Sequence, residues 1–411
     1  MRKTVISNVR LVFPGEKIRN GSLVFEQDRI VAICPEPCPT DAEMVDGAGG
    51  WLTPGLIDLH THGVGRFSYG GVPEDLVAGV ACLARYGTTT VFPTLVPRRT
   101  PDVLDRLRQA ADALDLVRGA RAPGLHLEGP FTALPGAGCD VVPGDLGFLQ
   151  ELLDACRGRV SIMSLSPDTP NIIPVIERLC ELGIVPFVTH TRADVSQTQA
   201  AIEAGARHAT HFYDVFPPPP EREPGVRPAG VVETFLADER TTVDFIADGC
   251  HVEPVVIRMA ARAKGAGGVI LITDSNIGAG LPPGEYATPM GFPVRVEPGN
   301  GARIADPQHE LFGALAGSAL TMDVGMANLL QWLDLPAEQV WAMGTANPAR
   351  VARLPHAGRL AVGAWADLVL WNRDLRPVRT WVAGRQVFSA AEDRAAGDTS
   401  SFTDERKTGQ E

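Results

Sequence analysis

Two histidines separated by one residue are the first feature of this sequence that could do chemistry. His60 and His62 stand at the end of an apolar run that begins at Leu56. Alternate side chains of a β-strand point to the same face, so both imidazoles could bind one cation. Because histidines also stabilise protein cores, a His-x-His pair needs further ligands before it indicates a metal site.

Three more metal-binding side chains stand within or at the end of other short apolar runs: Glu128, His190 and His211. A buried carboxylate is costly unless it is paired, for example with backbone or an arginine, or bound to a metal. A Glu/His/His set is common in hydrolytic zinc sites, which keep one position open for water. His126 shares a face with Glu128 and is expected to support it. His208 falls on the opposite face from His211 and is not expected to be a ligand.

Asp274 is the candidate general base. It directly follows the apolar run Val269–Thr273. A bound metal lowers the pKa of water to about 7, so a carboxylate can take its proton near neutrality. The expected role is to deprotonate this water and then to protonate the leaving nitrogen. The alternative is an aspartate that only orients a loop.

Two loop residues are candidates for substrate binding. Arg222 closely follows the prolines of residues 217–220, and His251 follows the apolar run that ends near Asp248. A guanidinium binds phosphate or carboxylate through two parallel hydrogen bonds. The alternative for both side chains is exposure to solvent.

Eight apolar runs must position these residues, and helix-like stretches separate many of them. The runs are Gly55–His62, Thr88–Thr94, Gly124–Gly129, Val160–Ser166, Val185–His190, His208–Tyr213, Thr241–Asp248 and Val269–Asp274. This alternation predicts an α/β protein with a (β/α)₈ TIM barrel. A doubly wound open sheet is less favoured, since no Gly-x-Gly-x-x-Gly follows the first run. The candidate ligands all fall at strand ends, which share one mouth in a barrel.

Both ends of the chain contain alternating, β-branched runs, such as Val5–Phe13 and Val378–Phe388. We therefore expect residues 1–52 and 355–390 to form a small β-sandwich domain beside a barrel of residues 53–354. The polar segment 391–411 lacks periodicity and is expected to be a disordered tail.

Composition excludes several classes of partner. The 411 residues include 37 basic and 49 acidic side chains, for a net charge of −12, which argues against a nucleic-acid surface. Seven cysteines without a framework indicate free thiols in a reducing compartment. No apolar stretch of about 18 residues and no signal segment is found, so we expect a cytoplasmic protein that binds no membrane.

These motifs together resemble the amidohydrolase superfamily and, within it, the N-acetylglucosamine-6-phosphate deacetylase family. The resemblance runs from about Val5 to Phe388. His-x-His and Thr-Asp indicate only the superfamily. The motifs His126-Leu-Glu-Gly-Pro130, Arg222-Glu-Pro-Gly225 and Ala316-Gly-Ser-Ala-Leu-Thr-Met322 are much more specific.

The resemblance implies a metal-dependent hydrolase that removes the acetyl group from N-acetylglucosamine-6-phosphate, giving glucosamine-6-phosphate and acetate. It implies one or two divalent ions, with zinc expected and iron or manganese as alternatives. The roles it implies are main-metal ligands Glu128, His190 and His211, second-metal ligands His60 and His62, base Asp274, and substrate contacts Arg222 and His251. Members are typically homodimers in which the neighbouring chain reaches the phosphate.

Two segments depart from the family pattern. Where the family has Lys-Gly-Ala-His, with a histidine that helps polarise the amide carbonyl, this chain reads Pro135-Gly-Ala-Gly138. A second metal or another donor would have to replace that histidine, and Ala137 is a candidate substrate contact. Asp214 stands where the family has an asparagine that donates to phosphate. A carboxylate close to a phosphate costs several kcal/mol at an effective dielectric constant near 20.

Three alternatives follow. The substrate could be an unphosphorylated or different N-acyl amine, because of Asp214 and the missing histidine. A cyclic-amide hydrolase such as a dihydroorotase is less favoured, because Val160–Ser166 lacks the lysine that those enzymes carboxylate. A non-catalytic barrel that binds metal or sugar remains open, although binding alone would not require Asp274.

Overall fold

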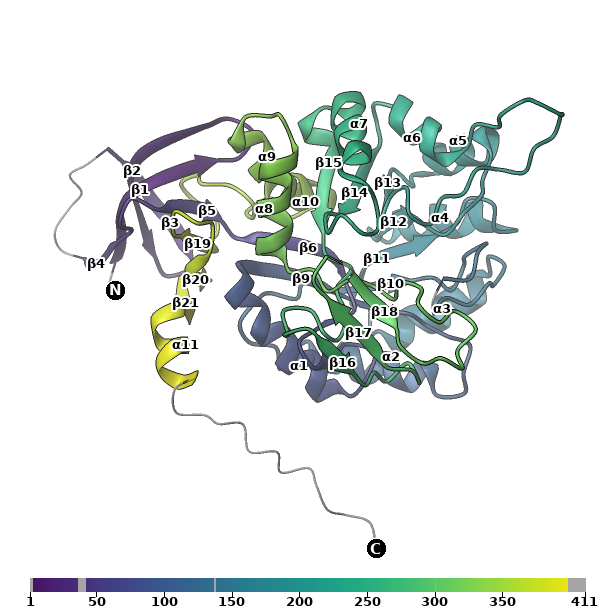
Figure 1. Cartoon of the computed structure of the whole chain (residues 1–411), viewed down its shortest axis with the longest axis horizontal. Coiled ribbons are helices and arrows are strands. Elements are labelled where there is room, and N and C mark those ends of the chain that lie inside the picture. Colours follow the sequence, from purple (N-terminus) through teal and green to yellow (C-terminus); the bar gives the residue numbers. More distant parts are fainter. Residues whose placement is uncertain (1–2, 36–41, 137, 300, 398–411) are drawn as a thin grey trace, which may run out of the picture.

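The computed structural model describes residues 3–35, 42–136, 138–299 and 301–397. Its centre is a sheet of eight parallel strands whose order follows the chain (Figure 1). The strands are β6 (Leu56–Thr61), β9 (Thr88–Leu95), β10 (Leu125–Glu128), β11 (Val160–Leu165), β12 (Val185–Val188), β13 (His208–Ala209), β14 (Thr242–Ile246) and β15 (Val269–Ile272). A backbone bond of 2.9 Å from Asp274 N to His60 O brings the last strand to the first. The predicted (β/α)₈ barrel is confirmed.

The barrel strands are mostly apolar and almost entirely buried, as expected for parallel strands covered on both faces. All eight residues of β9 are buried, and its threonines and Val91 are β-branched. Six strands contribute to one apolar cluster through Ile57, Phe92, Ile162, Phe187, Ile246 and Ile270. The barrel is therefore a packed core that holds the strand ends rigidly.

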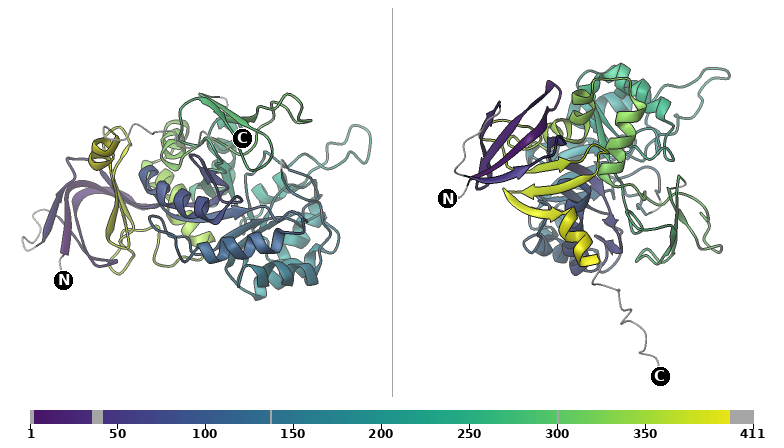
Figure 2. Two further views of the ribbon diagram at one scale, coloured as in Figure 1. Left: turned by 90° about the horizontal axis from the view of Figure 1, so that it is seen from below. Right: turned by 60° about the vertical axis from the view of Figure 1, so that its left-hand side comes forward.

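Helices cover the outside of the barrel (Figures 1 and 2). They are α1 (Pro73–Cys82), η1 (Leu83–Tyr86), α2 (Val103–Ala113), α3 (Leu146–Ala155), α4 (Ile172–Glu181), α5 (Val195–Ala204), α6 (Val231–Ala237), α7 (Pro254–Lys264), η2 (Ala266–Gly268), α8 (Met322–Trp332), α9 (Ala337–Gly344) and α10 (Ala346–Val351). Their buried faces join the outer faces of the strands in the largest apolar cluster. Among the described residues, no helix combines the length and apolar character needed to cross a membrane.

Both chain ends form one further sheet beside the barrel, drawn in purple and yellow in Figure 2. Its strands are β1 (Lys3–Phe13), β2 (Lys17–Glu26), β3 (Arg29–Cys34), β4 (Glu43–Asp46), β5 (Trp51–Pro54), β19 (Leu368–Trp371), β20 (Pro377–Val382) and β21 (Arg385–Ser389). Ile6 and Leu23 pack in one cluster with Leu368 and Trp381. A small β domain built from both ends is confirmed, and hydrogen bonds link all its strands into a single sheet. The residue limits given for the two domains stay predictions.

Part of the segment predicted as a disordered tail is helical. Residues Ala390–Gly397 form helix α11, which an ion pair of 2.7 Å between Arg85 and Asp393 attaches to η1. The segment is rich in alanine, the strongest helix former, and this propensity outweighs its polar character. The disorder predicted for 391–397 is therefore wrong, and residues 398–411 lie outside the described residues.

Two small sheets at the barrel mouth were not predicted. Strands β16 (Gly284–Tyr286), β17 (Val294–Glu297) and β18 (Gly301–Ile304) form an antiparallel sheet after β15. Strands β7 (Gly63–Val64) and β8 (Phe67–Ser68) form a hairpin after β6. The apolar positions of these strands are too few to show a periodic pattern in the sequence.

Candidate active site

Six candidate side chains converge at the mouth of the barrel: His60, His62, Glu128, His190, His211 and Asp274. Each stands on the last residues of a barrel strand or one or two residues beyond it. Five of the six are buried, and His62 is partly exposed. Chemically capable groups from the carboxyl ends of five different strands thus meet in one site.

Three of these residues have unusual backbone angles. The φ angles are 44° at His190, 35° at His211 and 47° at Asp274. Left-handed conformations are uncommon for residues other than glycine, and they concentrate at functional sites where the surrounding structure enforces them. The strained turns bring the three side chains toward the centre of the mouth immediately after their strands end.

Glu128 holds the first group of donors together. Its Oε1 lies 3.1 Å from Nε2 of His190 and 3.0 Å from Nε2 of His211. Its Oε2 lies 3.2 Å from Nε2 of His62 and 3.7 Å from Nε2 of His60. One carboxylate therefore bridges histidines from both parts of the site.

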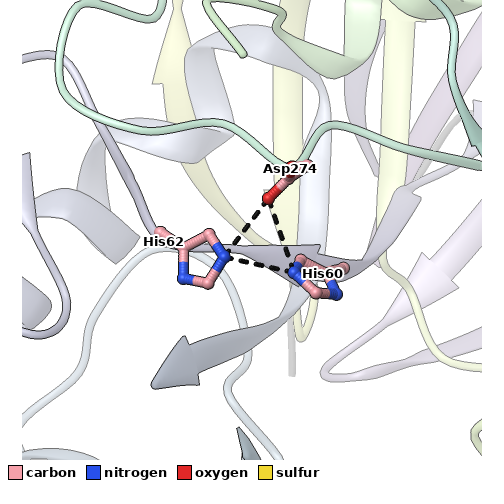
Figure 3. A group of neighbouring side chains, drawn as sticks. All are labelled: His60, His62 and Asp274. Carbon is pink, nitrogen blue, oxygen red and sulfur yellow. Dashed lines mark hydrogen bonds and ion pairs between the residues drawn. The ribbon is translucent and has the colours of Figure 1, made fainter. Parts of the chain in front are cut away.

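Asp274 completes the second group (Figure 3). Its Oδ1 lies 3.4 Å from Nε2 of His60 and 3.2 Å from Nε2 of His62, and the two nitrogens are 3.2 Å apart. Imidazole nitrogens and carboxylate oxygens at such spacing suit a divalent transition metal. Together with Glu128, this donor set fits either one ion or two neighbouring ions.

Neighbouring groups fix the rings. Thr210 Oγ1 lies 3.2 Å from Nδ1 of His60, and the amide of His211 donates to Asp244 over 2.6 Å. His126 is bound to Leu59 O at 2.8 Å and packs against the His60 ring, with centroids 4.7 Å apart. His126 therefore supports His60, and such outer contacts orient metal ligands.

The site is electrostatically poised for a cation. Burial lowers the pKa of His62, but the Asp274 and Glu128 carboxylates outweigh burial and raise this pKa to about 10. The same balance, with Glu128 as the main partner, raises the pKa of His211 to about 9. Burial raises the pKa of Glu128, yet the neighbouring histidines outweigh it and keep this pKa well below its usual range. Two buried carboxylates thus require positive charge from protons or from a metal.

A cavity of about 290 Å³ opens above these donors. Its wall includes two of the predicted substrate contacts, Asp214 and His251. The His251 side chain is only 3% exposed, and its Nδ1 lies 2.8 Å from Asp248 Oδ2, which orients the ring. Desolvation raises the pKa of Asp214. Both residues therefore lie where a substrate in the cavity would meet them.

Another predicted contact, Arg222, does not line the cavity. Arg222 has a side chain that is 78% exposed and forms an ion pair with Asp194, the N-cap of α5. It stands on the loop between β13 and α6, which projects from the barrel in Figure 1. Within a single chain, Arg222 does not line the cavity, and its contact with substrate stays a prediction. Ala137 lies outside the described residues.

The structure also reveals wall residues that the sequence reasoning missed, among them Arg98 and Cys139. The Cys139 thiol is buried and lies within 4.8 Å of donor atoms of Glu128 and His190. Arg98 stands three residues beyond β9, farther from its strand than the six donors, which stand at most two residues beyond theirs. Cys139 directly follows Pro135–Gly138, the stretch that departs from the family pattern.

Comparison with known proteins agrees with this geometry. Residues 51–387 match the model of the Amidohydrolase family. The chain is 30% identical to N-acetylglucosamine-6-phosphate deacetylase of Bacillus subtilis (strain 168), covering 94% of this chain and 98% of the relative. It is 31% identical to N-acetylgalactosamine-6-phosphate deacetylase of Shewanella sp. (strain ANA-3), covering 84% and 86%.

A solved structure shares the whole architecture. The crystal structure of N-acetyl-D-glucosamine-6-phosphate deacetylase from Mycobacterium smegmatis superimposes with a TM-score of 0.81 and 29% identity, covering 94% of this chain and 100% of that one. The family is metal-dependent, in agreement with the donor groups at the barrel mouth. The barrel, the strand-end donors and the family match lead to one conclusion: this chain belongs to the amidohydrolase family.

Proposed function

We propose that this protein hydrolyses the N-acetyl amide of an amino sugar, with N-acetylglucosamine-6-phosphate as the substrate. The observation that carries the proposal is the convergence of Glu128, His190 and His211 with Asp274 at the wall of one cavity. The relatives named as deacetylases of amino-sugar phosphates cover nearly the whole chain, which supports the same substrate class.

The residues present fit a divalent metal, and zinc is proposed, with iron or manganese as alternatives. Glu128, His190 and His211 would hold the main ion, and His60 and His62 would hold a second one if two are bound. A bound ion would polarise the acetyl carbonyl and lower the pKa of water to about 7.

Asp274 moves the proton in the proposed mechanism. One of its carboxylate oxygens accepts a proton from the water that attacks the acetyl carbonyl. The same group then returns this proton to the amide nitrogen as the C–N bond breaks, which releases acetate and the free amine. The His60 and His62 imidazoles, 3.4 and 3.2 Å from Asp274 Oδ1, stabilise the ionised form that this role requires.

The phosphate group of the substrate is proposed to contact a second chain. Arg222 does not line the cavity of its own chain, yet a guanidinium is the side chain best suited to a phosphate. We therefore propose a homodimer in which Arg222 of one chain reaches the cavity of the other. Gel filtration with light scattering tests this, and a monomer that still prefers phosphorylated sugar would contradict it.

One observation favours a second candidate function, deacylation of an unphosphorylated amine. Asp214 lines the cavity, where its carboxylate would repel a dianionic phosphate. The Asp214 carboxylate disfavours a phosphorylated substrate where it faces the phosphate in the complex. The two candidate functions therefore predict opposite substrate preferences.

The test is an amine-release assay that compares N-acetylglucosamine-6-phosphate, its galactosamine isomer and N-acetylglucosamine on one preparation. We expect the 6-phosphate to be cleaved with the highest kcat/KM and acetate to appear in equal amount. Faster cleavage of N-acetylglucosamine would support the second function. If metal-loaded protein cleaves none of the three sugars, both candidate functions are contradicted.

A further inference from the structure

A gap in the cavity wall lies at Gly138. A Cβ atom at Gly136 would come within 2.4 Å of the His190 ring, so that position has no room for a side chain. At Gly138, by contrast, a Cβ atom would meet only Arg98 Nη2 at 3.3 Å and Val96 Cγ1 at 3.9 Å. The backbone of Gly138 is not left-handed. The space beside Gly138 is therefore bounded by side chains of other residues and not by backbone.

The nearest of these groups is the guanidinium of Arg98. Its Nε donates to Gly138 O over 2.9 Å, which leaves its Nη2 beside the gap. Arg98 is partly buried and lines the same cavity as Glu128 and Asp274. The loop after β9 thus places a cationic side chain in the cavity wall directly beside position 138.

The charge of Arg98 is not neutralised by a carboxylate within 4.0 Å, as far as the described ranges extend. Arg106, which also lines the cavity, differs in this respect because it is paired with Asp102 at 3.1 Å. The exposed Arg99 lies over the Phe148 ring at 5.0 Å. A half-buried cation without an ion-pair partner is favourable where a ligand or reaction supplies negative charge.

Amide hydrolysis supplies such charge, because the carbonyl oxygen becomes an oxyanion when water adds. We propose that Arg98 donates a hydrogen bond from Nη2 to the oxygen of the scissile acetyl group. This inference rests on the proposed function and assigns the donor that Gly138 cannot provide. The guanidinium keeps its charge at all working pH values, so it transfers no proton. Its hydrogen bond to the carbonyl oxygen strengthens as that oxygen becomes negative.

The test compares kcat and KM of four proteins: wild type, Arg98→Ala, Arg99→Ala, and Arg98→Ala combined with Gly138→His. Removal of one oxyanion donor lowers kcat by about 100-fold or more, so we expect this loss for Arg98→Ala with KM nearly unchanged. Arg99→Ala removes an adjacent positive charge that does not line the cavity and should stay close to wild type. A histidine at position 138 fits once Arg98 is truncated and should restore kcat by about tenfold or more.

Binding of a methylphosphonamidate analogue of the substrate gives a readout independent of turnover. This analogue imitates the tetrahedral oxyanion, so Arg98→Ala should weaken it by a factor similar to the loss in kcat. Metal content and Tm, measured on every variant, confirm that the comparison is between folded, loaded proteins.

Two results would overturn the assignment. A kcat of Arg98→Ala within about threefold of wild type would exclude an oxyanion donor, whose loss costs far more. A raised KM with unchanged kcat would instead make Arg98 a ground-state contact of the sugar or its phosphate. If the wild type is inactive, both the proposed function and this inference are contradicted. If the wild type is active and Arg98→Ala is equally active, only the inference is contradicted.

Discussion

The two ends of the active-site cavity are built differently. At the metal end, donor atoms of Glu128 and its histidine partners lie 3.0 to 3.7 Å apart on buried strand ends. Farther from these donors, Asp214 lines the cavity from a loop just beyond β13, and Arg222 is 78% exposed on the projecting part of that loop, outside the cavity wall. Strand ends are fixed by the packed barrel, whereas loops vary with little cost to the fold. The comparison teaches that reaction type and substrate choice are encoded by different parts of the chain.

The largest effect is expected for Asp274→Asn at the metal end. An amide cannot accept the proton of the attacking water, and loss of a general acid–base lowers kcat by about 10²- to 10⁴-fold. Stopped-assay kinetics on N-acetylglucosamine-6-phosphate measures the loss, and metal analysis should still find an ion held by the Glu128 group. Full turnover by metal-loaded Asp274→Asn would disprove its role as the base.

The next effect concerns metal affinity. Glu128→Ala removes the carboxylate that contacts four histidines, so metal affinity should fall by more than the roughly 10- to 100-fold typical of outer contacts. Competition with a chromogenic chelator measures this affinity. Glu151→Ala, on the exposed face of α3, is the matched control and should bind metal like wild type. Equal affinity in both variants would mean that Glu128 is not a ligand.

The pH dependence of stability should separate metal-stripped from metal-loaded protein. The raised pKa values of His62 and His211 give stability that is full below about pH 6.5 and lost as pH rises through about 9 to 10. The lowered pKa values of Glu128 and Asp274 give stability that is lost only in acid. Stripped protein should therefore lose on the order of a few kcal/mol between pH 6.5 and 10.

Thermal unfolding across this range provides the measurement. Metal-loaded protein should change less, because a bound ion replaces the protons that hold the histidines and carboxylates together. Parallel decreases in Tm for the stripped and loaded forms would show that the cluster does not control this titration.

The smallest effect is expected at the substrate end. Asp214→Asn removes a negative charge from the cavity wall, so KM for the 6-phosphate should fall by about tenfold, or about 1.4 kcal/mol. The unphosphorylated sugar, assayed on the same variant, is the control and should change little. An equal change for both sugars would show that Asp214 does not face the phosphate.

The same difference explains what the sequence could predict. The barrel and its mouth follow from apolar runs that end in His62, Glu128, His190 or Asp274, because a strand end fixes where the next side chain points. The loop residues carry no comparable pattern. Arg222 resembles a substrate contact in sequence but projects outward, while Arg98 lines the cavity although its neighbourhood reads as an ordinary loop. Helix α11 does not follow from the polar composition of its segment, because alanine's helix propensity decides the structure there.

The most direct test of the central claim is metal add-back to chelator-stripped protein, with amine release from N-acetylglucosamine-6-phosphate and bound metal measured on each sample. The account predicts no turnover in the stripped protein and turnover that rises with bound metal until the Glu128 site is filled. Full turnover without metal, or a filled site that cleaves no N-acetyl amide, would contradict it.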